Sequence, residues 1–195
     1  MFNGYDKQID SSKVIFLDVD DTIADTRGGV YDYYVNSTGA APNVGINVID
    51  KNYSAFCTMW SDEQIQNIFT KPHQLYTNFV KPIPGAKEGV KALLDMGYDI
   101  RVVTLQSPSG VPAKHNWIER YFPELLDKVC YISDIHGNKD IFVGHAIIDD
   151  DHKNIKNSRC DKKILIDVYK QYPAMVNEKT YASSWKEVVK ILGGK

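Results

Sequence analysis

The ten residues 13–22, KVIFLDVDDT, constrain the fold of this chain more than any other stretch of the sequence. Residues 14–17 are continuously apolar, which is typical of a strand buried on both faces of a sheet. Asp18, Asp20 and Asp21 follow this strand directly. In open α/β sheets, ligands bind just beyond the carboxyl ends of the strands. Carboxylates are costly to desolvate there without a cation, so this run predicts a bound metal ion or proton.

Four later segments resemble this first strand, and helical patterns lie between them. The expected strands cover residues 98–104, 128–132, 145–149 and 163–167, and the third of them also runs into acids. Amphipathic helices are expected at residues 84–97, 111–121 and 183–192. Strands that alternate with helices predict the α/β class, with a Rossmann-like, doubly wound parallel sheet that is covered on both sides.

The stretch between the first and second strands is too long for one crossover helix. It holds a Gly/Asn-rich run at 39–47 and a helical pattern at 61–69, and the residues KPIPG at 81–85 mark the return to the core. We therefore expect two parts. Residues 1–25 and 82–195 would form the α/β core, and residues 26–81 would form a small, mainly helical cap over the strand ends.

Composition excludes several classes of partner. The 195 residues suit one core domain with a small insertion, and the formal net charge of −2 gives no general attraction to nucleic acid polymers or anionic membranes. The three cysteines are widely spaced and form no CxxC pair, as expected in a reducing compartment. No apolar run approaches the roughly 18 residues that a membrane helix needs. We expect a cytoplasmic protein.

Four short motifs occur in chain order at or near the expected strand ends: Asp18-x-Asp20-x-Thr22, Thr104, Lys139 and the pair Asp149-Asp150. Each is weak alone, because a single threonine or lysine in such a place is commonplace. Together they resemble the four signatures of the haloacid dehalogenase superfamily of phosphotransferases, which read DxDx[TV], Ser/Thr, Lys and an acidic pair. The resemblance covers the whole core and implies the core fold of that superfamily.

Within that superfamily, the chain is most similar to the 5′(3′)-deoxyribonucleotidases. The residues IAD at 23–25, with the glycine pair that follows at 28–29, resemble the end of that family's first motif. Residues 82–91, PIPGAKEGVK, resemble the exit from its cap. One departure concerns the second motif, which typically reads Thr-Ser-Pro. Here Leu105-Gln106 separates Thr104 from Ser107-Pro108, so the loop that would hold the phosphate is two residues longer.

The resemblance implies a role for each motif. Asp18 is the expected nucleophile and forms an aspartyl-phosphate, which splits one hard step into two. Asp20 is the expected general acid and then base, and crowding by other carboxylates is expected to raise its pKa. Thr104 and Lys139 would bind the phosphoryl oxygens and stabilise their charge in the transition state.

Mg²⁺ is the expected cofactor, because it prefers oxygen ligands in an octahedron. The resemblance implies that Asp18, the backbone carbonyl of Asp20, and Asp149 or Asp150 supply those ligands.

Candidate contacts with the rest of the substrate come from two places. Gln106 and Ser107 lie beside the second motif. In the expected cap, the aromatic residues Phe56, Trp60, Tyr76 and Phe79 could stack on a nucleobase. Packing among themselves is the alternative, because aromatic side chains are commonly buried.

The leading hypothesis is a Mg²⁺-dependent phosphomonoester hydrolase, most similar to a 5′-nucleotidase acting on (deoxy)nucleoside monophosphates. One alternative is a phosphatase of the same superfamily for another small phosphorylated metabolite. A non-enzymatic alternative is a receiver-type signalling module, whose phosphorylated aspartate is long-lived and drives partner binding. Receivers lack an insertion as long as residues 26–81. We expect a small phosphomonoester as the partner, and neither a nucleic acid polymer nor a membrane. Whether the chain forms a homodimer is left open.

Overall fold

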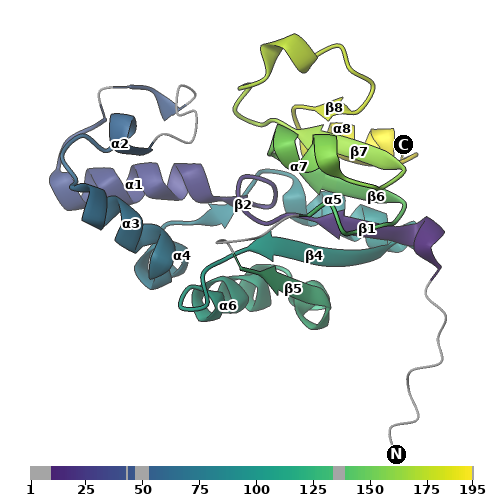
Figure 1. Cartoon of the computed structure of the whole chain (residues 1–195), viewed down its shortest axis with the longest axis horizontal. Coiled ribbons are helices and arrows are strands. Elements are labelled where there is room, and N and C mark those ends of the chain that lie inside the picture. The colour runs from purple at the N-terminus through teal and green to yellow at the C-terminus, as the bar shows by residue number, and fades with distance from the viewer. Residues whose placement is uncertain (1–9, 43, 47–52, 134–138, 195) are drawn as a thin grey trace, which may run out of the picture.

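A six-stranded parallel sheet forms the centre of the molecule (Figure 1). The structure is a computed structural model that describes residues 10–42, 44–46, 53–133 and 139–194. The strand order is β5-β4-β1-β6-β7-β8, so the first strand lies in the middle, between β4 and β6. The strands are β1 (Val14–Leu17), β4 (Asp99–Leu105), β5 (Val129–Ile132), β6 (Ala146–Asp149), β7 (Lys162–Ile166) and β8 (Tyr181–Ala182).

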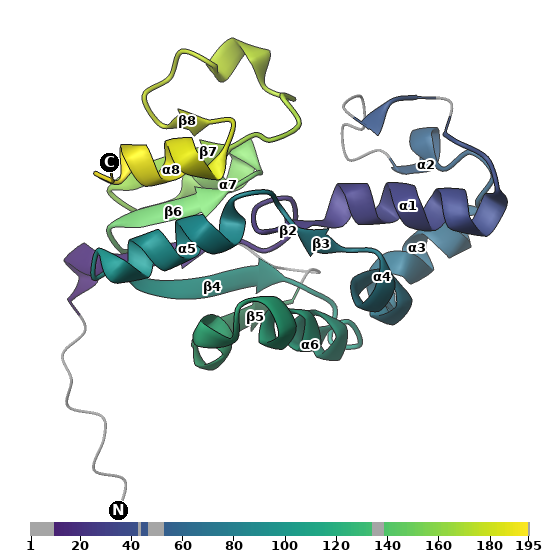
Figure 2. The ribbon, with the colours of Figure 1, turned by 180° about the vertical axis from the view of Figure 1, so that it is seen from behind.

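Helices and loops cover both faces of this sheet. Seen from behind, α5 (Ala86–Asp95), α6 (Val111–Tyr121) and α8 (Trp185–Ile191) lie over one face (Figure 2). On the opposite face, α7 (His152–Asn157) lies over β6 and β7 (Figure 1). Alternate residues of β1 divide between two apolar clusters, with Ile15 in the larger and Phe16 in the smaller. The expected Rossmann-like, doubly wound α/β fold is therefore confirmed.

Between residues 26 and 80, the described part of the chain forms four α-helices, which lie beyond the carboxyl ends of the strands (Figure 1). They are α1 (Thr26–Thr38), α2 (Tyr53–Phe56), α3 (Asp62–Thr70) and α4 (His73–Asn78). The chain enters through β2 (Ala24–Asp25) and returns through β3 (Lys81–Pro82), which pair antiparallel. We call these four helices the cap. The division into two domains at these borders stays a prediction.

Local sequence explains where the main elements begin. Asp25 caps α1 by accepting a hydrogen bond from the backbone N–H of Gly28 at 2.9 Å. Ser61 and Gln64 form a reciprocal capping box at the start of α3. Ser184 caps α8. The expected strands and helices differ from the observed ones by at most two residues at either end, whereas the two-residue strand β8 was not anticipated. Within the described ranges, no helix is long and apolar enough to cross a membrane.

Candidate active site

Lys139 connects two acidic strand ends. Its ammonium donates to Oδ1 of Asp18, just after β1, and to Oδ2 of Asp149, at the end of β6, the latter at 2.8 Å. All three side chains are buried. Asp149 also accepts from the backbone N–H of Asp151 at 2.8 Å and from Nδ2 of Asn154 at 3.1 Å. Three residues that are far apart in sequence thus share one buried polar network.

Charge in this network is unevenly balanced, because two carboxylates face one ammonium. Burial raises the pKa of Asp18 to about 6, and Asp149 and Asp20 raise it too, while Lys139 opposes them. For Lys139, burial acts to lower the pKa, but the two carboxylates outweigh burial and raise it. At neutral pH the Asp18 carboxylate is therefore ionised and Lys139 is charged, and the site keeps an excess of negative charge.

Three carboxylates in this region could hold a metal ion. Asp18, Asp149 and Asp150 each offer one oxygen, and these oxygens all lie within 4.8 Å of one another. Close, partly buried carboxylates raise each other's pKa unless a cation neutralises them, and hard oxygen donors suit Mg²⁺. The donor set and its excess negative charge therefore fit the expected ion. The side chain of Asp20 is not in this group, and a ligand role for its backbone carbonyl stays a prediction.

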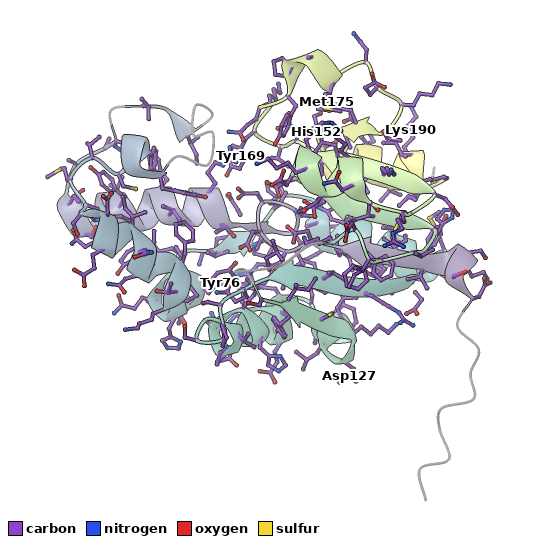
Figure 3. The ribbon with its side chains drawn as sticks, viewed as in Figure 1. Tyr76, Asp127, His152, Tyr169, Met175 and Lys190 are labelled. Atoms are coloured by element: carbon purple, nitrogen blue, oxygen red, sulfur yellow. The ribbon has the colours of Figure 1, made fainter. Side chains whose placement is uncertain are left out.

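Asp20 points toward a different set of partners. Its Oδ2 lies 2.5 Å from Nζ of Lys114, and its Oδ1 accepts from Oγ1 of Thr26 at 2.7 Å and from the hydroxyl of Tyr76. Tyr76, on α4, lies where the cap meets the carboxyl end of the sheet (Figure 3). Burial acts to raise the pKa of Asp20, but Lys114 and these hydrogen bonds hold it below its usual value. The expectation that carboxylate crowding raises this pKa is therefore wrong.

Lys114 also belongs to this candidate site, and the sequence reasoning missed it. It lies on α6, it is 1% exposed, and its ammonium also donates to Oγ1 of Thr104 at 2.9 Å and to the carbonyl of Leu105 at 3.0 Å. One signal was available: positions 114, 117, 118 and 121 share the apolar face of this helix. A lysine on such a face is rarely buried without a charged partner.

Thr104 lies beside this second lysine, near the end of β4, and is fully buried. Gln106 and Ser107 are in the loop between β4 and α6. Of these three, Gln106 lines a cavity of about 270 Å³ that opens next to Asp20. The described lining of this cavity consists of Asp20, Asp21, Thr26, Tyr53, Phe69, Pro72, Tyr76, Leu105, Gln106 and Asp150.

The aromatic residues expected to contact a nucleobase pack inside the cap instead, except for Tyr76. Phe56 is fully buried and lies 6.0 Å from Tyr34 between ring centroids. Trp60 packs edge-on against Tyr34 at 5.1 Å, and Phe79 stacks on Tyr33 at 5.0 Å. None of the three is among the described residues that line the cavity. The structure therefore favours the packing alternative, because the aromatic face of α1 supplies partners for all three.

The cavity has its own aromatic walls. Tyr53, Phe69 and Tyr76 line it together with Pro72. Its floor is acidic and lies over the strand ends, where Asp20 and Asp150 contribute. The site thus joins a buried carboxylate paired with a lysine, a second carboxylate paired with another lysine, and an apolar chamber beside them. Such an arrangement can bind a phosphate at the strand ends and an organic group toward the cap.

Comparisons with known proteins agree with this geometry. Residues 12–194 match the family model described as "5′ nucleotidase, deoxy (Pyrimidine), cytosolic type C protein". No curated protein matches the chain.

Several solved structures are similar in fold. A protein assigned as a phosphoglycolate phosphatase, from Lactobacillus delbrueckii, is 16% identical with a TM-score of 0.63, over 95% of this chain and 100% of its own. Protein tyrosine kinase A from Mycobacterium tuberculosis is 12% identical with a TM-score of 0.62, over 94% and 99%. A haloacid dehalogenase family hydrolase from Deinococcus radiodurans, with bound phosphate and sodium, is 12% identical with a TM-score of 0.57, over 95% and 99%.

Proposed function

The chain belongs to the 5′ nucleotidase, deoxy (pyrimidine), cytosolic type C family, and from that membership we propose a Mg²⁺-dependent hydrolase of deoxyribonucleoside monophosphates. At the coarser level the chain is a phosphatase of the nucleotidase type, which acts on a small phosphomonoester. The observation that most strongly supports the proposed chemistry at phosphorus is the bridge from Lys139 to Asp18 and Asp149, because it gathers three motifs around one carboxylate. We also propose the cytosol as its compartment, as the family description states.

In the proposed reaction, Asp18 attacks phosphorus. A bond forms between its carboxylate oxygen and phosphorus, the ester bond breaks, and Asp20 gives a proton to the leaving oxygen. Asp20 then takes a proton from water as the water attacks the aspartyl-phosphate, which releases inorganic phosphate and restores Asp18. Mg²⁺, held by Asp18, Asp149 or Asp150 and the backbone carbonyl of Asp20, would neutralise charge on the phosphoryl oxygens and the carboxylates.

In this cycle, the pairing with Lys114 lets Asp20 be ionised before the substrate binds and protonated afterwards. Without substrate, Lys114 holds the pKa of Asp20 low, so the carboxylate is ionised. A phosphate dianion nearby adds negative charge and competes for the lysine, and both effects raise the pKa of Asp20. Substrate binding would therefore supply the proton-bearing form that the first step needs. Thr104, through its contact with Lys114, would orient this ammonium.

The alternatives have less support. In a receiver module the phosphoaspartate is long-lived, so no acid/base residue is needed to hydrolyse it. Here Asp20 lies between Lys114 and the apolar cavity, where it could serve as such a residue. A phosphatase for another small metabolite would use the same acidic groups at the strand ends. The residues that line the rest of the cavity therefore distinguish a nucleotide from another phosphorylated metabolite. Three aromatic rings in that wall favour a substrate with a flat ring.

A phosphate-release assay tests the proposal. Deoxyribonucleoside and ribonucleoside monophosphates and sugar phosphates would be compared with and without Mg²⁺, using an Asp18→Asn variant as the blank. We expect Mg²⁺-dependent release from deoxyribonucleotides above all. Release from sugar phosphates alone would overturn the nucleotide assignment, and full activity in EDTA would overturn the metal dependence.

A further inference from the structure

The carboxyl end of α3 in the cap is held by side chains from the loop between β4 and α6 in the core. Nε2 of Gln106 donates to the carbonyl of Phe69 at 3.1 Å. Oγ of Ser109 donates to the carbonyl of Thr70 at 2.6 Å, and Oγ of Ser107 to the same carbonyl at 3.3 Å. The last carbonyls of a helix have no partner within the helix, so these side chains supply the hydrogen bonds that the carbonyls would otherwise lack. The longer loop of this chain thus reaches the cap.

These contacts fix the orientation of the Gln106 amide. Its nitrogen faces the Phe69 carbonyl and Oγ of Ser107, at 3.1 and 3.3 Å, and a reversed amide would set oxygen against carbonyl oxygen. Gly110 leaves room for the nitrogen, because a Cβ there would lie 1.9 Å from Nε2. The amide is therefore clamped, with the donor side turned to the cap.

The oxygen of the same amide remains for a ligand. Gln106 lines the cavity beside Asp20, and its Oε1 has no hydrogen-bond partner among the described residues. An amide oxygen is an acceptor only, so it repels a phosphate dianion and suits an N–H group. Phe69, whose carbonyl holds the amide, lines the same cavity.

We propose that Gln106 is a specificity-determining residue whose Oε1 accepts a hydrogen bond from an N–H of the nucleobase. This inference rests on the proposed function. It identifies the base N–H as the group of the substrate that the cavity recognises. A site built to hydrogen-bond an N–H discriminates against an analogue that lacks it, because the acceptor oxygen is then covered by the analogue and left unpaired. The clamp from α3 makes the acceptor rigid, so little rotamer freedom is lost when the base binds.

The experiment compares substrates with and without a base N–H. For the unaltered enzyme, we expect kcat/KM for dUMP and dCMP to exceed that of their N3-methyl and N4,N4-dimethyl counterparts by at least about tenfold for one of the two pairs. In Gln106→Leu that ratio should fall close to one. Hydrolysis of 2-deoxyribose 5-phosphate, which has no base, should fall far less than hydrolysis of dUMP or dCMP. The change should appear in KM more than in kcat.

Ser109→Ala is the matched control, because it removes a contact from the same loop to α3 without altering a residue of the cavity wall. It should leave the ratio between each nucleotide and its methylated counterpart unchanged. If Gln106→Leu lowers hydrolysis of dUMP, dCMP and 2-deoxyribose 5-phosphate equally, Gln106 only supports the loop and the inference is overturned. If the unaltered enzyme hydrolyses sugar phosphates but no nucleotide, the proposed function itself fails, which is a distinct result.

Discussion

Nζ of Lys114 and Oδ2 of Asp20 lie 2.5 Å apart, in a contact that joins α6 to the loop after β1. This ion pair makes the second acid of the first motif different from the first. Asp18 has a raised pKa because burial dominates its surroundings, whereas Asp20 has a lowered pKa because Lys114, Tyr76 and Thr26 outweigh burial. The proposed roles need the opposite order of pKa values, because a general acid must carry a proton while the nucleophile is ionised.

Replacement of Lys114 tests this pairing. We expect Lys114→Met to raise the pKa of Asp20, because Lys114 is the largest of the influences that lower it. The carboxyl resonance of Asp20, followed by NMR in metal-free protein, should titrate at higher pH than in the unaltered chain. We also expect kcat to fall by about 100-fold. Lys91→Met is the control, because Lys91 is exposed and, among the residues that the structure describes, pairs only with Asp95. An unchanged Asp20 titration would remove Lys114 from this role.

Loss of the proposed nucleophile should abolish turnover without unfolding the chain. Asp18→Asn is nearly isosteric, and Lys139 keeps Asp149 as a partner. We expect kcat to fall by at least about 10⁴-fold, with no acid-stable phosphoenzyme after quenching. Asp95→Asn, at an exposed carboxylate on α5, should be fully active. Turnover retained in purified Asp18→Asn would assign the nucleophile to another residue.

Metal binding can be measured without any activity. At a Mg²⁺ concentration 100 times its Kd, the ion should stabilise the folded protein by about 2.7 kcal/mol. For a chain of this length, this corresponds to a rise in Tm of about 5–10 °C. Asp150→Asn should weaken the shift, because it removes one of three oxygens that lie within 4.8 Å of one another. An equal shift in this variant would exclude Asp150 as a ligand.

The three cysteines should differ in reactivity toward a thiol reagent at pH 8. Cys130 is exposed, whereas burial raises the pKa of Cys57 to about 12 and also raises that of Cys160. Because the thiolate is the reactive form, a raised pKa slows the reaction. We expect one thiol to react at once in the native protein and the other two at least about 100-fold more slowly. In urea all three should react together, and a second fast thiol in the native protein would contradict the burial of Cys57 or Cys160.

One hydrogen bond between the core and the first helix of the cap can also be tested. The hydroxyl of Tyr169, on the loop after β7, donates to Oδ1 of Asp25, the residue that caps α1 (Figure 3). Tyr169→Phe removes that donor and keeps the ring beneath the guanidinium of Arg27. We expect a loss of about 1 kcal/mol in the free energy of unfolding, and therefore a fall of about 2–4 °C in Tm.

Tyr33→Phe is the matched control for Tyr169→Phe, because it breaks only an exposed hydrogen bond to Gln74. It should leave Tm nearly unchanged. Equal changes in Tm for both variants would show that the hydrogen bond to Asp25 stabilises the protein no more than the exposed hydrogen bond to Gln74 does.

Sequence reasoning was strongest where the chemistry lies at the end of a strand. β1 and β6 are short apolar runs that end in acids, and parallel neighbours bring their carboxyl ends to one edge. The fold class and the family resemblance were therefore both confirmed. The placement of Lys139 beside Asp18 and Asp149 also agrees with the expectation from motif order.

What escaped prediction depends on contacts between elements that local pattern does not encode. The lowered pKa of Asp20 requires Lys114 to arrive from α6, 94 positions along the chain. The walls of the cavity depend on which faces of the cap helices turn inward, so Phe56 and Trp60 went to the interior of the cap while Phe69 faces the cavity. The bond from Gln106 to α3 spans 37 positions and has no sequence signature.

Both active-site lysines already have carboxylate partners before any ligand arrives. In the proposed reaction, a phosphate that enters must therefore exchange with these internal carboxylates, and its net affinity would be the difference between two sets of similar attractions. Weak retention of free inorganic phosphate follows, because the vacated lysines can return to Asp18 and Asp20. Product escape is thus favoured by the same ion pairs that offset part of the carboxylate charge of the site.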